Sequence, residues 1–263
     1  MFDLKQFLAD PEEKPLDRMN HDGGFTNVFR TIGCIGDSLS SGEMETLGPD
    51  GKHMYIDCYE HSWGQYLARM TGAKVFNFSK GGMTAKAYFS DHSWRHRYWD
   101  TNSLCQAYII ALGLNDLVGE RIPLGKLEDC YSDTSVESFA YYYGKILRTL
   151  QEKTPHSKIF LVTMPRSDEK TYTDKKVHRD MLEEFAKSFP NTYLIDLFTY
   201  GPVYDSAFKK AFYLNNHLNA MGYYFTARMF ASYIDYIIRH NVEDFRRVAL
   251  IGSPNLDFSA NNT

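Results

Sequence analysis

The stretch Ala107–Leu112, AYIIAL, is continuously apolar, which is typical of a strand buried on both faces of a parallel sheet. Lys158–Thr163, KIFLVT, has the same character. Three further short apolar runs lie at Thr31–Ile35, Lys74–Phe78 and Thr192–Leu197. Each of the five is followed by a turn signal and then by a longer amphipathic stretch. We therefore predict five strands of one parallel sheet.

Amphipathic stretches alternate with these strands along the chain. They predict helices at His61–Met70, Val136–Gln151, Asp174–Ser188 and Ala220–Arg239. Regular alternation of strand and helix is the pattern of βαβ units, whose helices cover both faces of a sheet. The sequence therefore predicts an α/β protein, a three-layer α/β/α sandwich with a five-stranded parallel sheet.

The length of the chain indicates how many domains it forms, and its charge indicates which partners it can bind. The 263 residues fit a single domain, 1–263, with an N-terminal arm at 1–30 and a C-terminal tail at 252–263. The net charge of -4, without a long basic run, argues against a nucleic-acid partner. No segment reaches the roughly 20 apolar residues of a membrane span, and the first residues lack the apolar core of a signal peptide. We expect a cytoplasmic protein and leave its oligomeric state open.

A serine follows the first predicted strand, in the segment Gly36-Asp37-Ser38. Ligands of open parallel sheets bind outside the carboxyl ends of the strands, so a hydroxyl here points into the expected crevice. The backbone N–H of Ser38 faces the same space and favours a nucleophile with a built-in oxyanion donor. A turn in which Asp37 or Ser38 caps a helix accounts for the triplet equally well.

Hydrogen-bond donors follow the second and third strands. Gly81 and Gly82 allow the backbone to approach a ligand closely and to expose an N–H group. Asn115, after the third strand, offers a neutral side-chain amide to the same crevice. Tight turns that end in a helix cap are the alternative for both segments.

A histidine, His217, lies in a polar loop just before the last long helix. An imidazole there can accept a proton from a serine at neutral pH. Taken alone, such a histidine is more often structural. The four segments together are much more specific than any one of them.

In chain order, the four segments resemble the blocks of the GDSL or SGNH hydrolase family. The resemblance implies a flavodoxin-like SGNH fold and a serine esterase that cleaves carboxylic esters through an acyl-enzyme. It makes Ser38 the nucleophile and His217 the general base. It makes the Ser38 N–H, the Gly82 N–H and the Asn115 amide the oxyanion hole, with Gly81 as the near alternative to Gly82. Neither a metal nor an organic cofactor is implied.

One position departs from the family pattern. The family usually places an aspartate three residues before the histidine, and here that residue is Leu214. The candidates for holding the imidazole are a backbone carbonyl (or no partner, in a Ser-His dyad), then Asp205, then Asp196. Loss of the acid also supports the alternative function, a catalytically degenerate carbohydrate-binding or interaction protein on the same scaffold.

Aromatic residues make up 15% of the chain and favour a carbohydrate ester, such as an O-acetylated sugar, over other small-molecule esters. Trp94 and Tyr98 are the candidate substrate-lining rings. His92 and His96 have the i,i+4 spacing of a helical metal site, but no third ligand accompanies them, so we expect no metal there.

Overall fold

The computed structural model describes residues 4–167 and 169–253 and contains a five-stranded sheet in the order β4-β1-β5-β6-β7. All four neighbouring pairs in this sheet are parallel. The strands are β1 (Thr31–Gly36), β4 (Lys74–Asn77), β5 (Ala107–Ala111), β6 (Lys158–Val162) and β7 (Thr192–Ile195). The five predicted strands and their parallel arrangement are confirmed.

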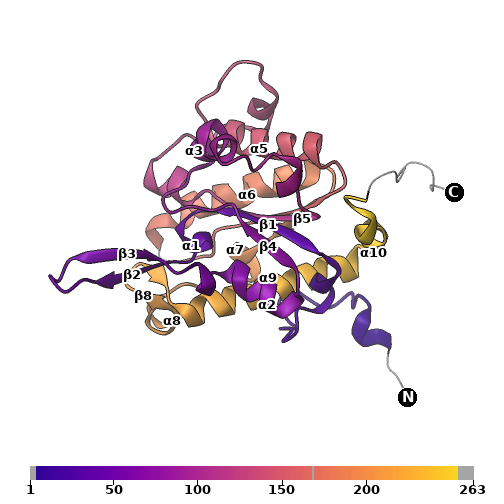
Figure 1. The fold of residues 1–263 in the computed structure, drawn as a ribbon, viewed down its shortest axis with the longest axis horizontal. Helices are drawn as coiled ribbons and strands as arrows, with labels where there is room; N and C mark the ends of the chain where they lie inside the picture. The colour runs from indigo at the N-terminus through magenta and orange to yellow at the C-terminus, as the bar shows by residue number, and fades with distance from the viewer. Residues whose placement is uncertain (1–3, 168, 254–263) are drawn as a thin grey trace.

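Helices cover both faces of the sheet (Figure 1). On one face, α2 (Trp63–Thr71) and α9 (Ala220–His240) pack against Ile32 and Ile109. On the other, α5 (Phe139–Lys153) and α6 (Tyr172–Ser188) pack against Ile35, Ile110 and other alternate strand residues. Because the central strands β5 and β6 bury side chains on both faces, their sequences are almost continuously apolar. The predicted three-layer α/β/α sandwich is confirmed.

The strand order places the site. Within this sheet the chain runs from β1 to β4 on one side of β1, and then returns to the other side of β1 to form β5. The strand order therefore reverses between β1 and β5. Such a switch point opens a crevice outside the carboxyl ends of the strands. Ser38 follows β1 and Asn115 follows β5, so both predicted site residues lie at this crevice.

Two antiparallel hairpins outside the main sheet were not predicted. The first is formed by β2 (Glu43–Leu47) and β3 (His53–Asp57), and it projects from the body of the protein (Figure 1). The second is formed by β8 (Tyr213–Leu214) and β9 (His217–Leu218). β2 lies against both β8 and β9, so the two hairpins meet beside the carboxyl edge of the sheet.

The remaining helices are short. The α-helices are α1 (Ser38–Ser41), α3 (Ala85–Ala87), α4 (Ser93–Arg95), α7 (Leu197–Tyr200), α8 (Ser206–Phe212) and α10 (Val242–Phe245). The 3-10 helices are η1 (Leu4–Phe7), η2 (Gly24–Val28), η3 (Tyr59–His61), η5 (Thr101–Ser103), η7 (Leu127–Tyr131), η8 (Glu169–Thr171) and η9 (Val248–Leu250). Two π-helices are η4 (Tyr88–His92) and η6 (Leu114–Gly119).

The N-terminal arm, 1–30, lies along α9 over its described part. The Thr26 hydroxyl donates to the Ala231 carbonyl (2.8 Å), and the Phe25 N–H donates to Asp235 (2.7 Å). Most of the expected C-terminal tail, at 254–263, falls outside the described residues. Within residues 4–167 and 169–253, no helix combines the length and the apolar character needed to cross a membrane.

Candidate active site

The nucleophile candidate sits in a tightly bonded turn at the carboxyl end of β1. The Asp37 carboxylate accepts a hydrogen bond from the Leu39 N–H (3.0 Å) and so caps α1, whose first residue is Ser38. The hydroxyl of buried Tyr223 donates to the Ser38 carbonyl (3.2 Å). The Ser38 N–H donates to no other described residue and remains available to a ligand. The helix cap that was the alternative interpretation of this segment is therefore present.

Two buried carboxyl groups lie beneath this turn. Burial raises the pKa of the Asp37 carboxyl to about 7; the Leu39 N–H opposes this rise and nearby Glu43 adds to it. Burial also raises the pKa of Asp116 to about 7, although the Ala85 N–H donates to it at 2.9 Å. Both groups therefore take up protons close to neutral pH.

The other expected oxyanion donors, Gly82 and Asn115, lie in the segments that follow β4 and β5. Gly82 has a φ of 70°, a conformation that favours glycine, and its N–H donates to no other described residue. The Asn115 side-chain amide donates to the Met83 carbonyl (3.2 Å) and, at 3.5 Å, to Asp37. These contacts hold the segments after β1, β4 and β5 together, and they direct the Asn115 amide to acceptors within the protein.

Two glutamates bracket the imidazole of His217. Its Nδ1 lies 3.4 Å from Glu45 Oε2, and its Nε2 lies 3.3 Å from Glu43 Oε1. Glu45 is buried, with 1% of its side chain exposed, and it also accepts from the Asn216 N–H (3.0 Å) and from His53 Nδ1 (2.5 Å). Burial disfavours the charge on Glu45, but these hydrogen bonds outweigh it and lower the pKa of the carboxyl.

The acids considered from the sequence have other partners. Asp205 caps α8 by accepting from the Phe208 N–H (2.9 Å). Asp196 caps α7 and binds Arg179 (3.0 Å). Among the described residues, the carboxylates within 4 Å of the His217 ring nitrogens are those of Glu43 and Glu45. The position expected for Asp205 beside the imidazole is therefore held by Glu45, because the projecting hairpin brings β2 against β9.

Sequence reasoning missed both glutamates, although a signal for them exists. Glu43 and Glu45 follow the nucleophile turn directly and are two residues apart. In a strand, residues at this spacing point to the same face. A pair of acids on one face of a strand beside the nucleophile is a candidate partner for a histidine. Leu214, at the family's acid position, is paired with His217 across the β8–β9 hairpin and is 42% exposed.

Ser38 and His217 lie on elements that pack together, α1 and β9. Within the described residues, however, the Ser38 hydroxyl and the imidazole share no hydrogen bond, and Nε2 faces Glu43 instead. Catalytic hydrogen bonds are often long without substrate and tighten in the reacting complex. The elements that carry Ser38 and His217 are in contact, but the two side chains are not hydrogen-bonded to each other.

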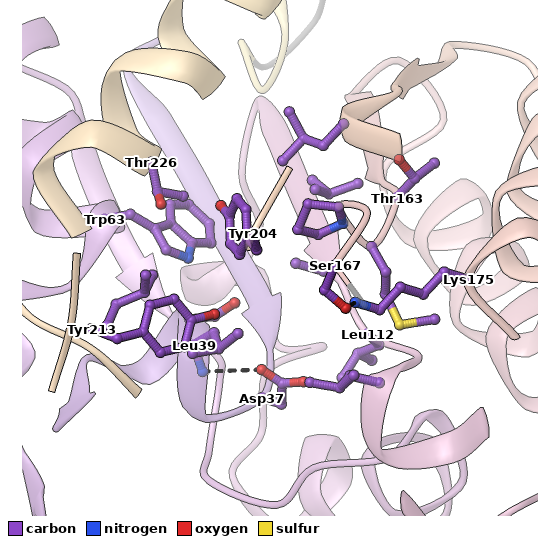
Figure 2. A pocket seen from close by; sticks show the side chains of 18 of the residues that line it. Asp37, Leu39, Trp63, Leu112, Thr163, Ser167, Lys175, Tyr204, Tyr213 and Thr226 are labelled. Carbon is purple, nitrogen blue, oxygen red and sulfur yellow. Dashed lines mark hydrogen bonds between the residues drawn. The ribbon is translucent and has the colours of Figure 1, made fainter. Parts of the chain in front are cut away.

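A cavity of about 260 Å³ adjoins the nucleophile turn (Figure 2). Asp37 and Leu39, which flank Ser38, line it together with Asn216, which precedes His217, but Ser38 and His217 themselves are not among the described residues that line it. In Figure 2, Trp63, Tyr204 and Tyr213 form one side, while Lys175 and Ser167 point toward each other on the opposite side. The walls are mostly apolar, with polar groups at a few points, as is usual for small-molecule sites.

Trp94 and Tyr98, the rings expected to line the substrate site, do not line this cavity. Tyr98 packs on Phe78 at a ring distance of 4.4 Å, and Trp94 packs on Trp99 at 6.0 Å. Neither is among the described residues that line the cavity. The ring centroids of His92 and His96 are 4.5 Å apart, and the described residues supply no third ligand to them.

The comparison with protein families decides the relationship. A model of the GDSL-like Lipase/Acylhydrolase family matches residues 34–225, which is more than half of the chain. The chain belongs to this family. The resemblance found in the four segments is thus confirmed. No curated protein matches the sequence closely enough to add to this.

Solved structures share the fold of this GDSL-like protein. One is a carbohydrate esterase of family 2 from Clostridium thermocellum in complex with cellohexaose (TM-score 0.55, 16% identity, covering 88% of this chain and 66% of that one). Another is a family 2 carbohydrate esterase with a carbohydrate-binding domain from Corynascus thermopiles (Myceliophthora fergusii) (TM-score 0.52, 17% identity, covering 77% of this chain and 64% of that one). A third is the psychrotrophic esterase EstA from Pseudoalteromonas sp. (TM-score 0.52, 16% identity, covering 79% of this chain and 98% of that one). The chain spans about two thirds of the length of the first two. At these identities, the similarity shows the fold.

Proposed function

We propose that the protein hydrolyses carboxylic esters through an acyl-enzyme formed on Ser38. His217 Nε2 takes the hydroxyl proton while the Ser38 oxygen attacks the ester carbonyl, and the resulting oxyanion is bound by the Ser38 N–H, the Gly82 N–H and the Asn115 amide. The bond to the alcohol then breaks, and Nε2 returns the proton to the departing oxygen. Water repeats the sequence and releases the carboxylic acid.

Glu45 carries the role of the missing aspartate in this proposal. A carboxylate on Nδ1 fixes the tautomer in which Nδ1 carries the proton, so that Nε2 is left to accept one from Ser38. The hydrogen bonds from the Asn216 N–H and His53 hold Glu45 in place and keep it ionised. This buried carboxylate on the imidazole is the single observation that most supports catalysis.

The proposed substrate is an ester of a carbohydrate, such as an O-acetylated sugar. Its support is the fold shared with carbohydrate esterases and the cavity beside the nucleophile turn, whose volume suits a small group. The contact between Nε2 and Glu43 requires a local rearrangement of these two side chains before Ser38 can be deprotonated.

The test is labelling with a fluorophosphonate probe, combined with hydrolysis of p-nitrophenyl acetate. We expect the wild type to be labelled and active, and S38A to be unlabelled, with activity lower by at least about 10³-fold. E60Q, which changes an exposed carboxylate outside the site, serves as the control and should still be labelled. Labelling of S38A equal to that of the wild type would exclude Ser38 as the nucleophile.

A non-catalytic carbohydrate-binding role is the second candidate. The open Ser-His pair and Leu214 at the family's acid position favour it. A binder would bind acetylated oligosaccharides in calorimetry without labelling of Ser38 or release of acetate. Release of acetate by the wild type, lost in S38A, would exclude this role.

A further inference from the structure

Glu43 occupies a position that its neighbour Glu45 does not. Its Oε1 lies 3.3 Å from His217 Nε2, and its Oε2 lies directly over Gly81, where any added Cβ would clash with it. Its carbonyl shares the hydrogen of the buried Tyr223 hydroxyl with the Ser38 carbonyl and is the nearer acceptor (2.5 Å), which fixes the start of β2. Glu43 therefore lies between the general base and the segment of the expected oxyanion hole.

The two glutamates face different nitrogens of one ring. Glu45 faces Nδ1, which takes no part in proton transfer, whereas Glu43 faces Nε2, which takes and returns the proton in the proposed reaction. Glu45 is sealed from solvent, while 18% of the Glu43 side chain is exposed. Glu43 is thus the more accessible of the two carboxylates.

We propose that Glu43 selects the alcohol part of the ester, favouring alcohols that carry a hydroxyl group next to the ester oxygen. This inference rests on the proposed function. The departing oxygen must come within hydrogen-bond reach of Nε2 to receive its proton. Since Glu43 Oε1 lies 3.3 Å from that same nitrogen, a hydroxyl on the adjoining carbon of the alcohol falls within reach of the carboxylate.

The hydrogen-bonding needs of the carboxylate give the selection its physical basis. In the tautomer that accepts the Ser38 proton, Nε2 carries no hydrogen and donates nothing to Glu43. An ionised carboxylate accepts hydrogen bonds and donates none, so a substrate hydroxyl supplies the donor that the ring does not. An alcohol without a donor leaves the carboxylate unpaired, and an alcohol that carries an anion is repelled. Vicinal diols, as in partly acetylated sugars and polyols, meet the requirement.

Glycerol 1-acetate and n-propyl acetate test the inference, because they share the acyl group and the three-carbon chain and differ in the hydroxyls. We expect the wild type to prefer glycerol 1-acetate by about tenfold in kcat/KM, the effect of one hydrogen bond to a charged group. E43A should bring the ratio close to one. E43Q, whose amide oxygen still accepts, should retain part of the preference, and it should hydrolyse the anionic ester O-acetyl lactate faster than the wild type does.

Two matched variants separate selection from general damage. E60Q removes an exposed carboxylate outside the site and should change neither the rate nor the ratio. E45Q should slow both esters equally and leave the ratio as it is. If E43A left the ratio of kcat/KM for the two esters unchanged while hydrolysis still depended on Ser38, the role of Glu43 would be overturned and the proposed function would stand. Absence of hydrolysis and of Ser38 labelling in the wild type would overturn the proposed function and this role with it.

Discussion

The two halves of the candidate active site are built in different ways. The oxyanion half consists of Ser38, Gly82 and Asn115, each in the turn that follows a strand of the parallel sheet. The histidine half consists of His217 on one hairpin and Glu45 on another, and neither hairpin belongs to that sheet. The strands of the core fix the first half, whereas contact between two peripheral hairpins fixes the second.

This difference has a physical consequence. Turns after buried parallel strands inherit the rigidity of a closely packed core. Hairpins outside the core have fewer buried contacts, and every residue of β3 is exposed. The buried Glu45 carboxylate, with its bonds to His53, Asn216 and His217, replaces the core as the element that aligns the imidazole. The histidine half should therefore depend on a single side chain more than the oxyanion half does.

The largest expected effect is that of E45Q. We expect kcat for p-nitrophenyl acetate to fall by about 10²–10⁴-fold, because the amide no longer holds the imidazole in its reactive tautomer or stabilises its charged form. KM should change little, since Glu45 is sealed from the substrate. Steady-state kinetics measure both constants, with E60Q as the control for loss of one negative charge. A decrease below fivefold would indicate a Ser-His dyad and would remove the contrast drawn between the two halves.

The oxyanion half is tested by N115A. Removal of one donor should lower kcat by about 10²–10³-fold, while Ser38 keeps its position. The lost hydrogen bond to the Met83 carbonyl should also cost about 1 kcal/mol in the free energy of unfolding. Kinetics and urea unfolding report the two effects separately. Near-normal kcat together with reduced stability would mean that Asn115 only holds the turns together.

The same contrast explains what the sequence could predict. The apolar runs at Ala107–Leu112 and Lys158–Thr163 identify central strands, because burial on both faces leaves a continuous local pattern. Ser38 and Asn115 could be placed because each directly follows such a strand. Glu45 could not, because its partner His217 is 172 residues away and the two meet only when separate hairpins pack together. Trp94 and Tyr98 were placed by composition, which does not say whether a ring joins the core or a cleft.

A pH-dependent effect is expected for the carboxyl group next to the nucleophile. The pKa of Asp37 is raised to about 7 in the folded protein, from 3.8. Between these values the folded state binds a proton that the unfolded chain has released, so this group lowers stability as pH rises from 4 to 7. D37N keeps the cap of α1 but does not titrate. As pH rises from 5 to 8, the wild type should lose about 2–3 kcal/mol of unfolding free energy that D37N does not lose. Parallel stability profiles in urea unfolding would contradict the raised pKa.

The smallest effect is expected at Asp205, the acid on which the histidine half would depend if the sequence were the only guide. In the structure its carboxylate caps α8. D205N keeps an equally good cap and should leave kcat within a factor of two of the wild type, whereas D205A should lower the free energy of unfolding by about 1 kcal/mol, again with kcat nearly unchanged. Thermal unfolding and steady-state kinetics on the two variants separate the cap from catalysis. If D205N lost activity as E45Q is expected to, Asp205 rather than Glu45 would support the imidazole during turnover, and the segment before α8 would have to move toward His217 for that to happen.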